Sequence, residues 1–237
     1  MEFNGKTLTV FGKFESTEGD ASEAFEAGKK AEYDAFWDAF QQNGKRTSYA
    51  YGFTGIGWTD ENFKPKYDIR PTNAIYVFRE SMVKNMKQCL ESCGVSLDLS
   101  SAKNCDRLFY GMERLTILPK INISSAESCP YIFANCYALT TIEELRIGEK
   151  TTFASSTSFV KCNALTNLTM TGVLATNGLN LADCKKLSHE SLMSVLNVLQ
   201  DKTAVGGTWT VTLGTENLAK LTDTEKAIAT QKGWSLV

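Results

Sequence analysis

A repeated block of sequence constrains this chain more than any other feature. Three segments align with one another: CDRLFYGMERLTIL from Cys105, CPYIFANCYALTTI from Cys129 and SSTSFVKCNALTNL from Ser155. A shorter fourth segment, LADCKKLS, begins at Leu181. The shared pattern is Phe-x-x-Cys-x-x-Leu-Thr, with Met112 in place of Cys in the first copy and Leu181 in place of Phe in the last. Such self-similarity indicates that one supersecondary unit is stacked several times.

The length of the repeat narrows the fold class. The key residues are Phe109, Phe133 and Phe159, spaced by 24 and 26 residues, and Leu181 follows 22 residues later. Periods of about 20 to 29 residues are typical of leucine-rich repeats. A unit of this size cannot bury its apolar face alone, but stacked neighbours can. The sequence therefore predicts an α/β fold in the form of a short leucine-rich-repeat-like solenoid.

Each unit contains two different periodicities. Ile132, Phe133, Cys136 and Leu139 follow one another at i, i+1, i+4 and i+7, which places them on one side of a short helix. The stretches LPKINIS, ELRIG and NLTMTG then alternate apolar and polar residues, as a half-buried strand does. Each unit is therefore predicted to be a helix or helical turn, a turn and a strand.

The repeat also accounts for most of the cysteines. Cys136, Cys162 and Cys184 occupy one repeat position, and Cys105 and Cys129 occupy another, four residues before the phenylalanine. A small, weakly polar side chain suits a position inside a stack. Because the chain has one histidine and no Cys-x-x-Cys, a zinc site is not indicated.

Cys89 and Cys93, in CLESC, stand apart from the repeat and are one helical turn apart. They are the pair that could form a disulfide or bind a metal. The alternative is that both are ordinary thiols. An odd number of cysteines, seven, in a chain without a recognisable leader favours reduced thiols.

The repeats are expected to lie between two capping regions. Residues 77–99 read as a degenerate first unit or N-terminal cap, so the repeat region is assigned to residues 77–187. Residues 188–237 are predicted to form an α/β C-terminal cap. It contains a helix capped by Ser188, the strand TWTVTLG, a helix opened by the capping box TDTE at Thr222, and the final strand WSLV.

Residues 1–45 are expected to attach or oligomerise the chain. Residues 1–14 contain KTLTVFGKF, in which Leu8 and Val10 alternate with threonines and predict one strand. An amphipathic helix is predicted from Asp20 to about Gln42, with a stop at Asn43-Gly44. It either packs on the rest of the domain or forms an aromatic oligomerisation seam. Its aromatic face consists of Phe25, Tyr33, Phe36, Trp37 and Phe40.

Residues 46–76 are rich in aromatic residues and glycine and are predicted to be an irregular connector. Their GFTGIG does not have the spacing of a phosphate-binding loop, and no Gly-Lys-Ser/Thr follows it. Nucleotide binding is therefore not expected there.

Composition and charge disfavour several classes of function. A net charge of -2 offers no general attraction to nucleic acid or to an acidic membrane. No segment approaches the roughly 18 apolar residues of a membrane span, and the start MEFNGKTLTV lacks the cationic and apolar regions of a signal peptide. We therefore expect folding in a cytoplasm, with no nucleic-acid partner and no membrane insertion.

No pattern of residues indicates catalysis. His189, the single histidine, lies two residues from Ser191 at the start of the predicted helix, where a solvated residue is expected rather than a catalytic base. The carboxylate pairs Glu143-Glu144 and Asp60-Glu61 fall in predicted turns, and nothing raises glycosidase geometry above background. We expect no catalytic, cofactor or metal site. Residues that bind a partner leave no periodic trace in the sequence.

The units FANCYALTTI and FVKCNALTNL resemble the BspA-type leucine-rich repeats. The ending that starts LSHESLMSVLNVLQ is similar to the closing segment of such proteins in bacteriophages and prophages of gut bacteria. The stretch that starts AGKKAEYDAFWDAF is similar to the region that precedes their repeats. The resemblance covers about residues 27–237 and leaves residues 1–20 outside it.

The resemblance implies a non-enzymatic structural protein of a phage tail, baseplate or other virion appendage, whose repeats present a surface for protein or host-surface recognition. Expected partners are other virion proteins, through the N-terminal region, and a host-surface protein or glycan. A homo-oligomer is expected, with a trimer by analogy. The alternative is a bacterial surface adhesin or interaction protein, which would need an export signal or wall anchor. A third reading, a glycan-active enzyme, requires converging carboxylates.

Overall fold

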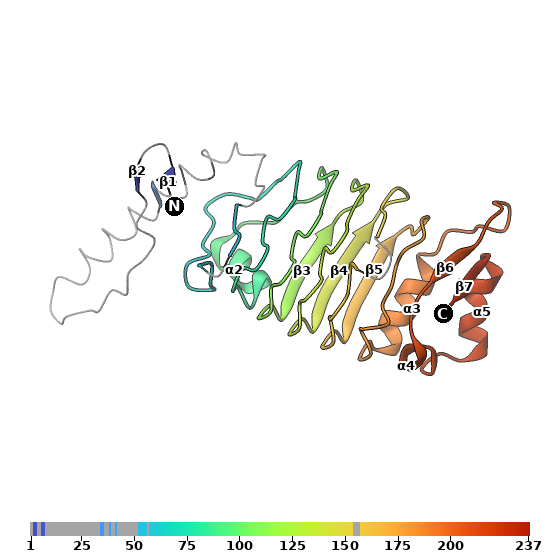
Figure 1. Cartoon of the computed structure of the whole chain (residues 1–237). Helices are drawn as coiled ribbons and strands as arrows, with labels where there is room; N and C mark the ends of the chain where they lie inside the picture. Colours follow the sequence, from blue (N-terminus) through green and yellow to red (C-terminus); the bar gives the residue numbers. More distant parts are fainter. Residues whose placement is uncertain are drawn as a thin grey trace.

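The chain has a mixed α/β fold with parallel sheets and few helices (Figure 1). The strands of the main sheet lie side by side along an elongated row, which ends near the C-terminus in a smaller sheet accompanied by helices. The computed structural model describes residues 2–3, 6–7, 34–35, 38, 41, 52–55, 57–153 and 157–237.

Three parallel strands form the main sheet, in the order β3 (Ile117–Asn122), β4 (Thr141–Ile147) and β5 (Asn167–Gly172). They coincide with the stretches that alternate apolar and polar residues, so the strand prediction is confirmed. Leu118 pairs in register with Ile142, which pairs with Leu168, and all three side chains are buried.

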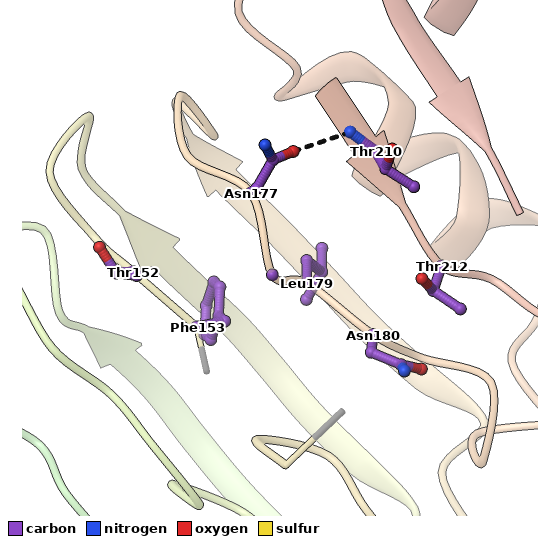
Figure 2. A pocket seen from close by; sticks show the side chains of 8 residues that line it. Thr152, Phe153, Asn177, Leu179, Asn180, Thr210 and Thr212 are labelled. Carbon is purple, nitrogen blue, oxygen red and sulfur yellow. Dashed lines mark hydrogen bonds between the residues drawn. The ribbon is translucent and has the colours of Figure 1, made fainter. Parts of the chain in front are cut away.

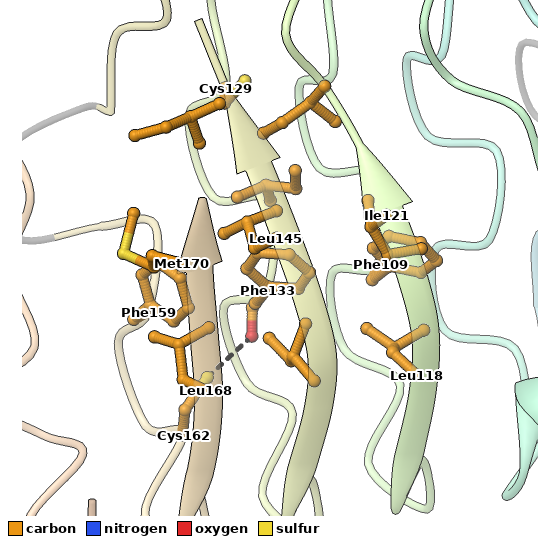
Figure 3. Close-up of a cluster of buried hydrophobic side chains, with 14 of the residues drawn as sticks. Phe109, Leu118, Ile121, Cys129, Phe133, Leu145, Phe159, Cys162, Leu168 and Met170 are labelled. Carbon is orange, nitrogen blue, oxygen red and sulfur yellow. Dashed lines mark hydrogen bonds between the residues drawn. The ribbon is translucent and has the colours of Figure 1, made fainter. Parts of the chain in front are cut away.

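A stack of phenylalanine rings runs through the core. The rings belong to Phe53, Phe78, Phe109, Phe133 and Phe159, and their centroids are 5.1, 5.5, 5.6 and 5.0 Å apart in that order. Figure 3 shows the last three rings beside the inward side chains of the strands. We call the chain from one of these phenylalanines to the next a coil. The phenylalanine ring of each coil thus stacks on the ring of the next coil.

The stretch 46–76, expected to be an irregular connector, contributes to the same core. Phe53 and Ile69 are fully buried. The Phe53 N–H donates to the carbonyl oxygen of Val77 at 2.8 Å, and later coils are joined by bonds of the same kind. The ring stack therefore extends two positions further toward the N-terminus than the three phenylalanines found from the repeat.

The segment around each core phenylalanine forms consecutive β-turns, and the predicted short helix is wrong. Arg107 and Gly111 have φ angles of 50° and 69°, and Tyr131 and Asn135 repeat this one coil later at 54° and 63°. A right-handed helix cannot continue through left-handed residues. The i, i+4, i+7 spacing arises instead because the turns return the side chains to the same face.

The threonine at the end of the repeated motif forms hydrogen bonds to the preceding coil. The hydroxyl and the N–H of Thr140 both donate to the carbonyl oxygen of Thr116, at 3.0 and 2.9 Å. Thr166 bonds to Thr140 in the same way, at 3.0 Å for both donors. The repeated Leu-Thr therefore supplies one buried apolar residue and one hydroxyl that joins successive coils.

Helix α3 (His189–Asn197) closes the free edge of β5. The Ser191 hydroxyl oxygen accepts the N–H of Leu168 at 2.8 Å, and the Ser194 hydroxyl oxygen accepts the N–H of Met170 at 3.0 Å. An open strand edge invites pairing with another chain. Here two serine side chains occupy the hydrogen-bonding positions of a further strand.

The other elements of the C-terminal region follow the predicted order. The α3 N-cap is Ser188, and the N-cap of α5 is Thr222, which forms the predicted capping box with Glu225. A short helix, α4, was not predicted. The bounds are β6 Trp209–Val211, α4 Thr215–Leu218, α5 Asp223–Gln231 and β7 Trp234–Leu236, and β6 pairs with β7 in parallel.

Helix α2 (Met86–Cys93) lies in the expected degenerate unit and contacts β3. Its N-terminus is capped by the Asn85 side chain, which accepts the N–H of Gln88, and it ends at Gly94 with a φ of 64°. No helix among the described residues is long and apolar enough to cross a membrane.

The described parts of residues 1–45 give a partial view of the predicted strand and helix. β1 (Glu2–Phe3) and β2 (Lys6–Thr7) form an antiparallel pair, where a single strand was predicted. Gln41 is fully buried, and its side-chain oxygen accepts the N–H groups of Lys66 and Tyr67 at 2.9 and 3.0 Å. The residues with helical backbone are Asp34, Ala35 and Asp38, whereas Leu8, Val10, the five aromatic residues of the predicted helix face and Asn43-Gly44 lie outside the described residues.

Candidate functional site

Tyrosine and arginine side chains gather on the solvent side of the turns and form the strongest candidate for a binding surface. They come from three successive coils and from two repeat positions, two residues before and one residue after the core phenylalanine. All are partly exposed, whereas the phenylalanines between them are buried. We call this set the Tyr–Arg cluster: Tyr76, Arg79, Arg107, Tyr110 and Tyr131.

Each guanidinium of the cluster lies against two aromatic rings. The Arg107 Cζ is 4.4 Å from the ring centroid of Tyr131 and 5.4 Å from that of Tyr76. The Arg79 Cζ is 5.4 Å from Tyr76 and 5.7 Å from Tyr110, and the rings of Tyr110 and Tyr131 meet edge to face. The ring quadrupoles attract the cations. The five side chains therefore support one another in one arrangement.

The cluster carries no net charge when its immediate neighbours are included. Arg107 pairs with Asp106 at 2.9 Å, and Arg79 pairs with Glu80 at 2.8 Å. Arg107 also donates to the hydroxyl of Tyr76 at 3.0 Å. Tyrosine and arginine are enriched at the energetic centres of protein interfaces. The arrangement suits contact with a polar, weakly charged surface rather than with a polyanion.

Three residues of the Tyr–Arg cluster have a left-handed backbone. Tyr76, Arg107 and Tyr131 have φ angles of 56°, 50° and 54°. A left-handed conformation costs a side chain with a Cβ roughly 1 to 2 kcal/mol, and residues held in it cluster at functional sites. At the second left-handed position of the coils, Gly111 and Asn135 tolerate this conformation, whereas Glu80 and Lys161, with φ angles of 58° and 62°, do not. Strained backbone is therefore a general feature of the turns, and three members of the Tyr–Arg cluster share it.

A cleft lies between the coil that precedes β5 and strand β6 (Figure 2). It has a volume of about 420 Å³, and none of its lining residues is ionisable. Phe153 and Leu179, each 1% exposed, close its floor. We call it the Asn–Thr cleft, after the polar residues Thr152, Asn177, Asn180, Thr210 and Thr212 in its walls.

The cysteines placed by the repeat are free, buried thiols. The Cys136 thiol donates to the carbonyl oxygen of Phe109 at 3.1 Å, and burial raises its pKa well above the ordinary value. A thiol that stays protonated is a poor nucleophile and a poor metal ligand. The predicted packing position is confirmed for Cys105, Cys129, Cys136, Cys162 and Cys184, all with 0% exposure.

Cys89 and Cys93 are both free thiols and do not form a disulfide. The Cys89 sulfur lies 3.6 Å from Oδ1 of Asp60, and burial raises the pKa of Cys89 to about 12. Among the residues that the structure describes, no group of three or more His, Cys, Asp or Glu side chains could hold a metal ion.

His189 occupies the solvated position predicted for it, at the first residue of α3. Its side chain is 46% exposed, and its Nε2 lies 2.8 Å from Oε1 of Glu225. The Ser191 hydroxyl instead lies 3.0 Å from that of Ser188 and donates to the carbonyl oxygen of Thr166. The structure thus brings His189 to a carboxylate and not to a nucleophile.

The two carboxylate pairs have different surroundings. Asp60 and Glu61 lie in a turn, as predicted. Glu143 and Glu144 lie within β4, so the predicted turn is wrong there. Lys87 pairs with Glu143 at 2.7 Å, and the hydroxyl of Thr171 donates to Glu144 at 2.7 Å. These partners are those of surface carboxylates that join neighbouring elements.

The Tyr–Arg cluster was missed in the sequence, although its members do occupy repeat positions. Aligning the coils on the core phenylalanine places Tyr76, Arg107 and Tyr131 in one column and Arg79 and Tyr110 in another. The alignment of these columns is the sequence signal for the cluster, and it contradicts the expectation that binding residues leave no periodic trace.

Comparison of the chain with family models, with curated proteins and with solved structures gave no significant match.

Proposed function

We propose that this chain is a non-enzymatic binding protein, built as a short leucine-rich-repeat-like solenoid of the BspA type, and that it is a structural component of a bacteriophage tail, baseplate or other virion appendage. The observation that carries the binding role is the Tyr–Arg cluster. Its side chains are ordered by one another before any partner arrives, which reduces the entropic cost of binding.

The difference between buried and exposed positions supports a repeat scaffold. In the coils that begin at Phe109, Phe133 and Phe159, buried positions keep the same type of residue: phenylalanine, then cysteine or methionine, then leucine. The exposed positions beside the phenylalanine change, from Tyr76 to Arg107 to Tyr131. A scaffold with a constant core and varied outward residues is what solenoid proteins use to present binding surfaces.

The assignment to a virion is supported by the resemblance of the repeats and of the closing segment to phage proteins. In this proposal the N-terminal region contacts other virion proteins and forms the homo-oligomer, while the coils face a protein or glycan of the host surface. Enzymatic activity is not part of the proposal.

Two measurements test the two halves of the proposal. Immunoblotting of purified particles, followed by cryo-EM of the intact virion, would locate the chain in an appendage. If the protein never co-sediments with particles, the virion assignment is refuted, and the adhesin alternative takes its place.

The rate at which phage particles adsorb to host cells tests whether the Tyr–Arg cluster is a binding surface. Phage carrying Arg107→Ala or Tyr131→Ala should adsorb at least about tenfold more slowly, since truncation of an interface centre costs more than about 1.4 kcal/mol. Tyr137→Ala is the matched control, because Tyr137 is 40% exposed and lies outside the cluster. Equal adsorption by all three variants would contradict a recognition role for the Tyr–Arg cluster.

A further inference from the structure

We propose that the Asn–Thr cleft binds a neutral sugar, one or two residues of an uncharged glycan. Only the location of this sugar on the host surface rests on the proposed function. The cleft is separate from the Tyr–Arg cluster in sequence and in composition. The cleft has preformed walls, unused hydrogen-bonding groups and an uncharged lining.

The walls of the cleft are fixed by hydrogen bonds of the protein itself. The Asn177 side chain donates to the carbonyl oxygen of Thr208 at 2.9 Å and accepts the N–H of Thr210 at 2.8 Å, the bond drawn in Figure 2. The N–H of Thr212 donates to the carbonyl oxygen of Leu179 at 3.1 Å. Strand β6 is thereby held against the loop that follows β5. The cleft is therefore already formed before a ligand binds.

Several polar groups of the lining have no hydrogen-bond partner among the described residues. They are the hydroxyls of Thr210 and Thr212 and the side-chain nitrogen of Asn180. Asn180 accepts the N–H of Ala182 through Oδ1 at 3.0 Å, which fixes its amide with Nδ2 as the remaining group. All three residues are half-buried. These groups can serve a ligand without breaking any bond of the fold.

The chemistry of the lining selects a neutral, hydroxyl-rich ligand. Hydroxyl and amide groups can donate and accept, as sugar hydroxyls do. A charged ligand would give up hydration without gaining an ion pair, because no lining residue is ionisable. The volume of about 420 Å³ lies within the range of about 300 to 1,000 Å³ of small-ligand sites. The expected ligand is therefore an uncharged sugar rather than a phosphorylated, sulfated or sialylated one.

Binding can be measured with the purified full-length chain. A glycan array that holds neutral and acidic glycans identifies the class, and saturation-transfer NMR with glucose, galactose, mannose and N-acetylglucosamine identifies the monosaccharide. We expect neutral glycans to bind and acidic glycans to bind no better than background. Absence of neutral binders, or a preference for acidic ones, would overturn the proposal.

Substitutions locate the binding in the cleft. Thr210→Val with Thr212→Val removes two hydroxyls at nearly constant shape and should weaken sugar binding by about tenfold, because two hydrogen bonds to the ligand are lost. Thr169→Val on β5 is the matched control, because Thr169 is exposed and lies outside the cleft. If the double variant does not fold, each single variant is measured and should lose about threefold. Equal affinity of cleft variants and control would refute the site.

The two proposals fail in different experiments. Glycan binding by the purified chain without co-sedimentation with particles would support the cleft and refute the virion role. A chain found in virions that binds no neutral glycan would support the virion role and refute the cleft.

Discussion

The Cys162 thiol donates a hydrogen bond to the carbonyl oxygen of Phe133, one coil earlier, at a sulfur to oxygen distance of 3.1 Å. The pair Cys136 and Phe109 repeats this bond at 3.1 Å. The repeated cysteine therefore joins each coil to the preceding one and fills the core beside the ring stack. Its role in the sequence motif is one of packing and hydrogen bonding.

Truncating this side chain should weaken the fold. Cys162→Ala removes a buried sulfur and its hydrogen bond, and we expect the free energy of unfolding to fall by about 1 to 2 kcal/mol. Cys162→Ser should lose less, because Ser81 is a buried serine at the equivalent position of an earlier coil. Equilibrium urea unfolding measures both. An unchanged midpoint for the alanine variant would contradict the packing role.

Thiol accessibility gives a second prediction. In the native protein, iodoacetamide should label Cys93 first, because Cys93 is the only cysteine that is not buried. Burial raises the pKa of Cys89 to about 12 and that of Cys136 well above the ordinary value, so neither supplies thiolate near neutral pH. Mass spectrometry with and without urea would show the order. Early labelling of Cys136 would mean that the coils open readily.

Glycine is required where the backbones of two coils approach closely. A Cβ added at Gly148 would overlap the backbone carbonyl oxygen of Ser124. We expect Gly148→Ala to lower the free energy of unfolding by about 2 to 3 kcal/mol or more, since backbone must move to make room. Gly206→Ala is the control, because nothing lies within 4 Å of its added Cβ. Thermal unfolding of the two variants side by side would separate crowding from a general glycine effect.

The serine closure of β5 gives a prediction about local protection. The Ser194 hydroxyl oxygen accepts the N–H of Met170 at 3.0 Å, and its proton can donate to the carbonyl oxygen of Ser191 at 2.7 Å or to that of Leu168 at 3.1 Å. Ser194→Ala leaves the N–H of Met170 without this partner and should cost about 1 to 3 kcal/mol. Amide hydrogen exchange at Met170 should accelerate accordingly. Ser92→Ala on the exposed side of α2 should leave exchange at Met170 unchanged.

The Thr222 capping box predicts a pH dependence of stability. Hydrogen bonds from the backbone and hydroxyl of Thr222, and then from His189, lower the pKa of Glu225. A carboxyl whose folded-state pKa is lowered stabilises the fold above its unfolded pKa of about 4.3, and this contribution is lost as the pH falls through the folded pKa. Glu225→Gln should therefore lower the melting temperature at pH 7. The difference from the unsubstituted protein should shrink below about pH 4. A difference that stays constant down to pH 2 would show that the carboxylate charge is not involved.

The sequence predicted those features that depend on a residue's own neighbours in the chain. The strands follow from alternation, the α5 start follows from Thr222 and Glu225, and the buried cysteines follow from their period. The apolar spacing predicts a helix where the chain forms turns, because this spacing is the same for both. What separates them is the left-handed backbone at Arg107 and Gly111, and only Gly111 among these is a residue that signals it.

Other features depend on contacts between coils and leave weaker signals. Phe53 and Phe78 belong to the ring stack, but α2 and its flanking residues lengthen the step from Phe78 to Phe109 to 31 residues and obscure the period. The Tyr–Arg cluster exists because stacking brings together side chains that are some 20 to 30 residues apart. The Asn–Thr cleft likewise joins Phe153 to Thr212 through the arrangement of the coils.

The ring stack makes this architecture modular in length. Along the chain, successive stacked phenylalanines are separated by 24 to 31 residues. Their centroids nevertheless remain 5.0 to 5.6 Å apart. Inserted residues are thus absorbed outside the stack, and within the stack each ring contacts the rings before and after it. Duplication or deletion of one complete coil would leave every remaining ring contact of the same kind, so evolution can change the number of coils, and with it the outward surface, without redesigning the interior.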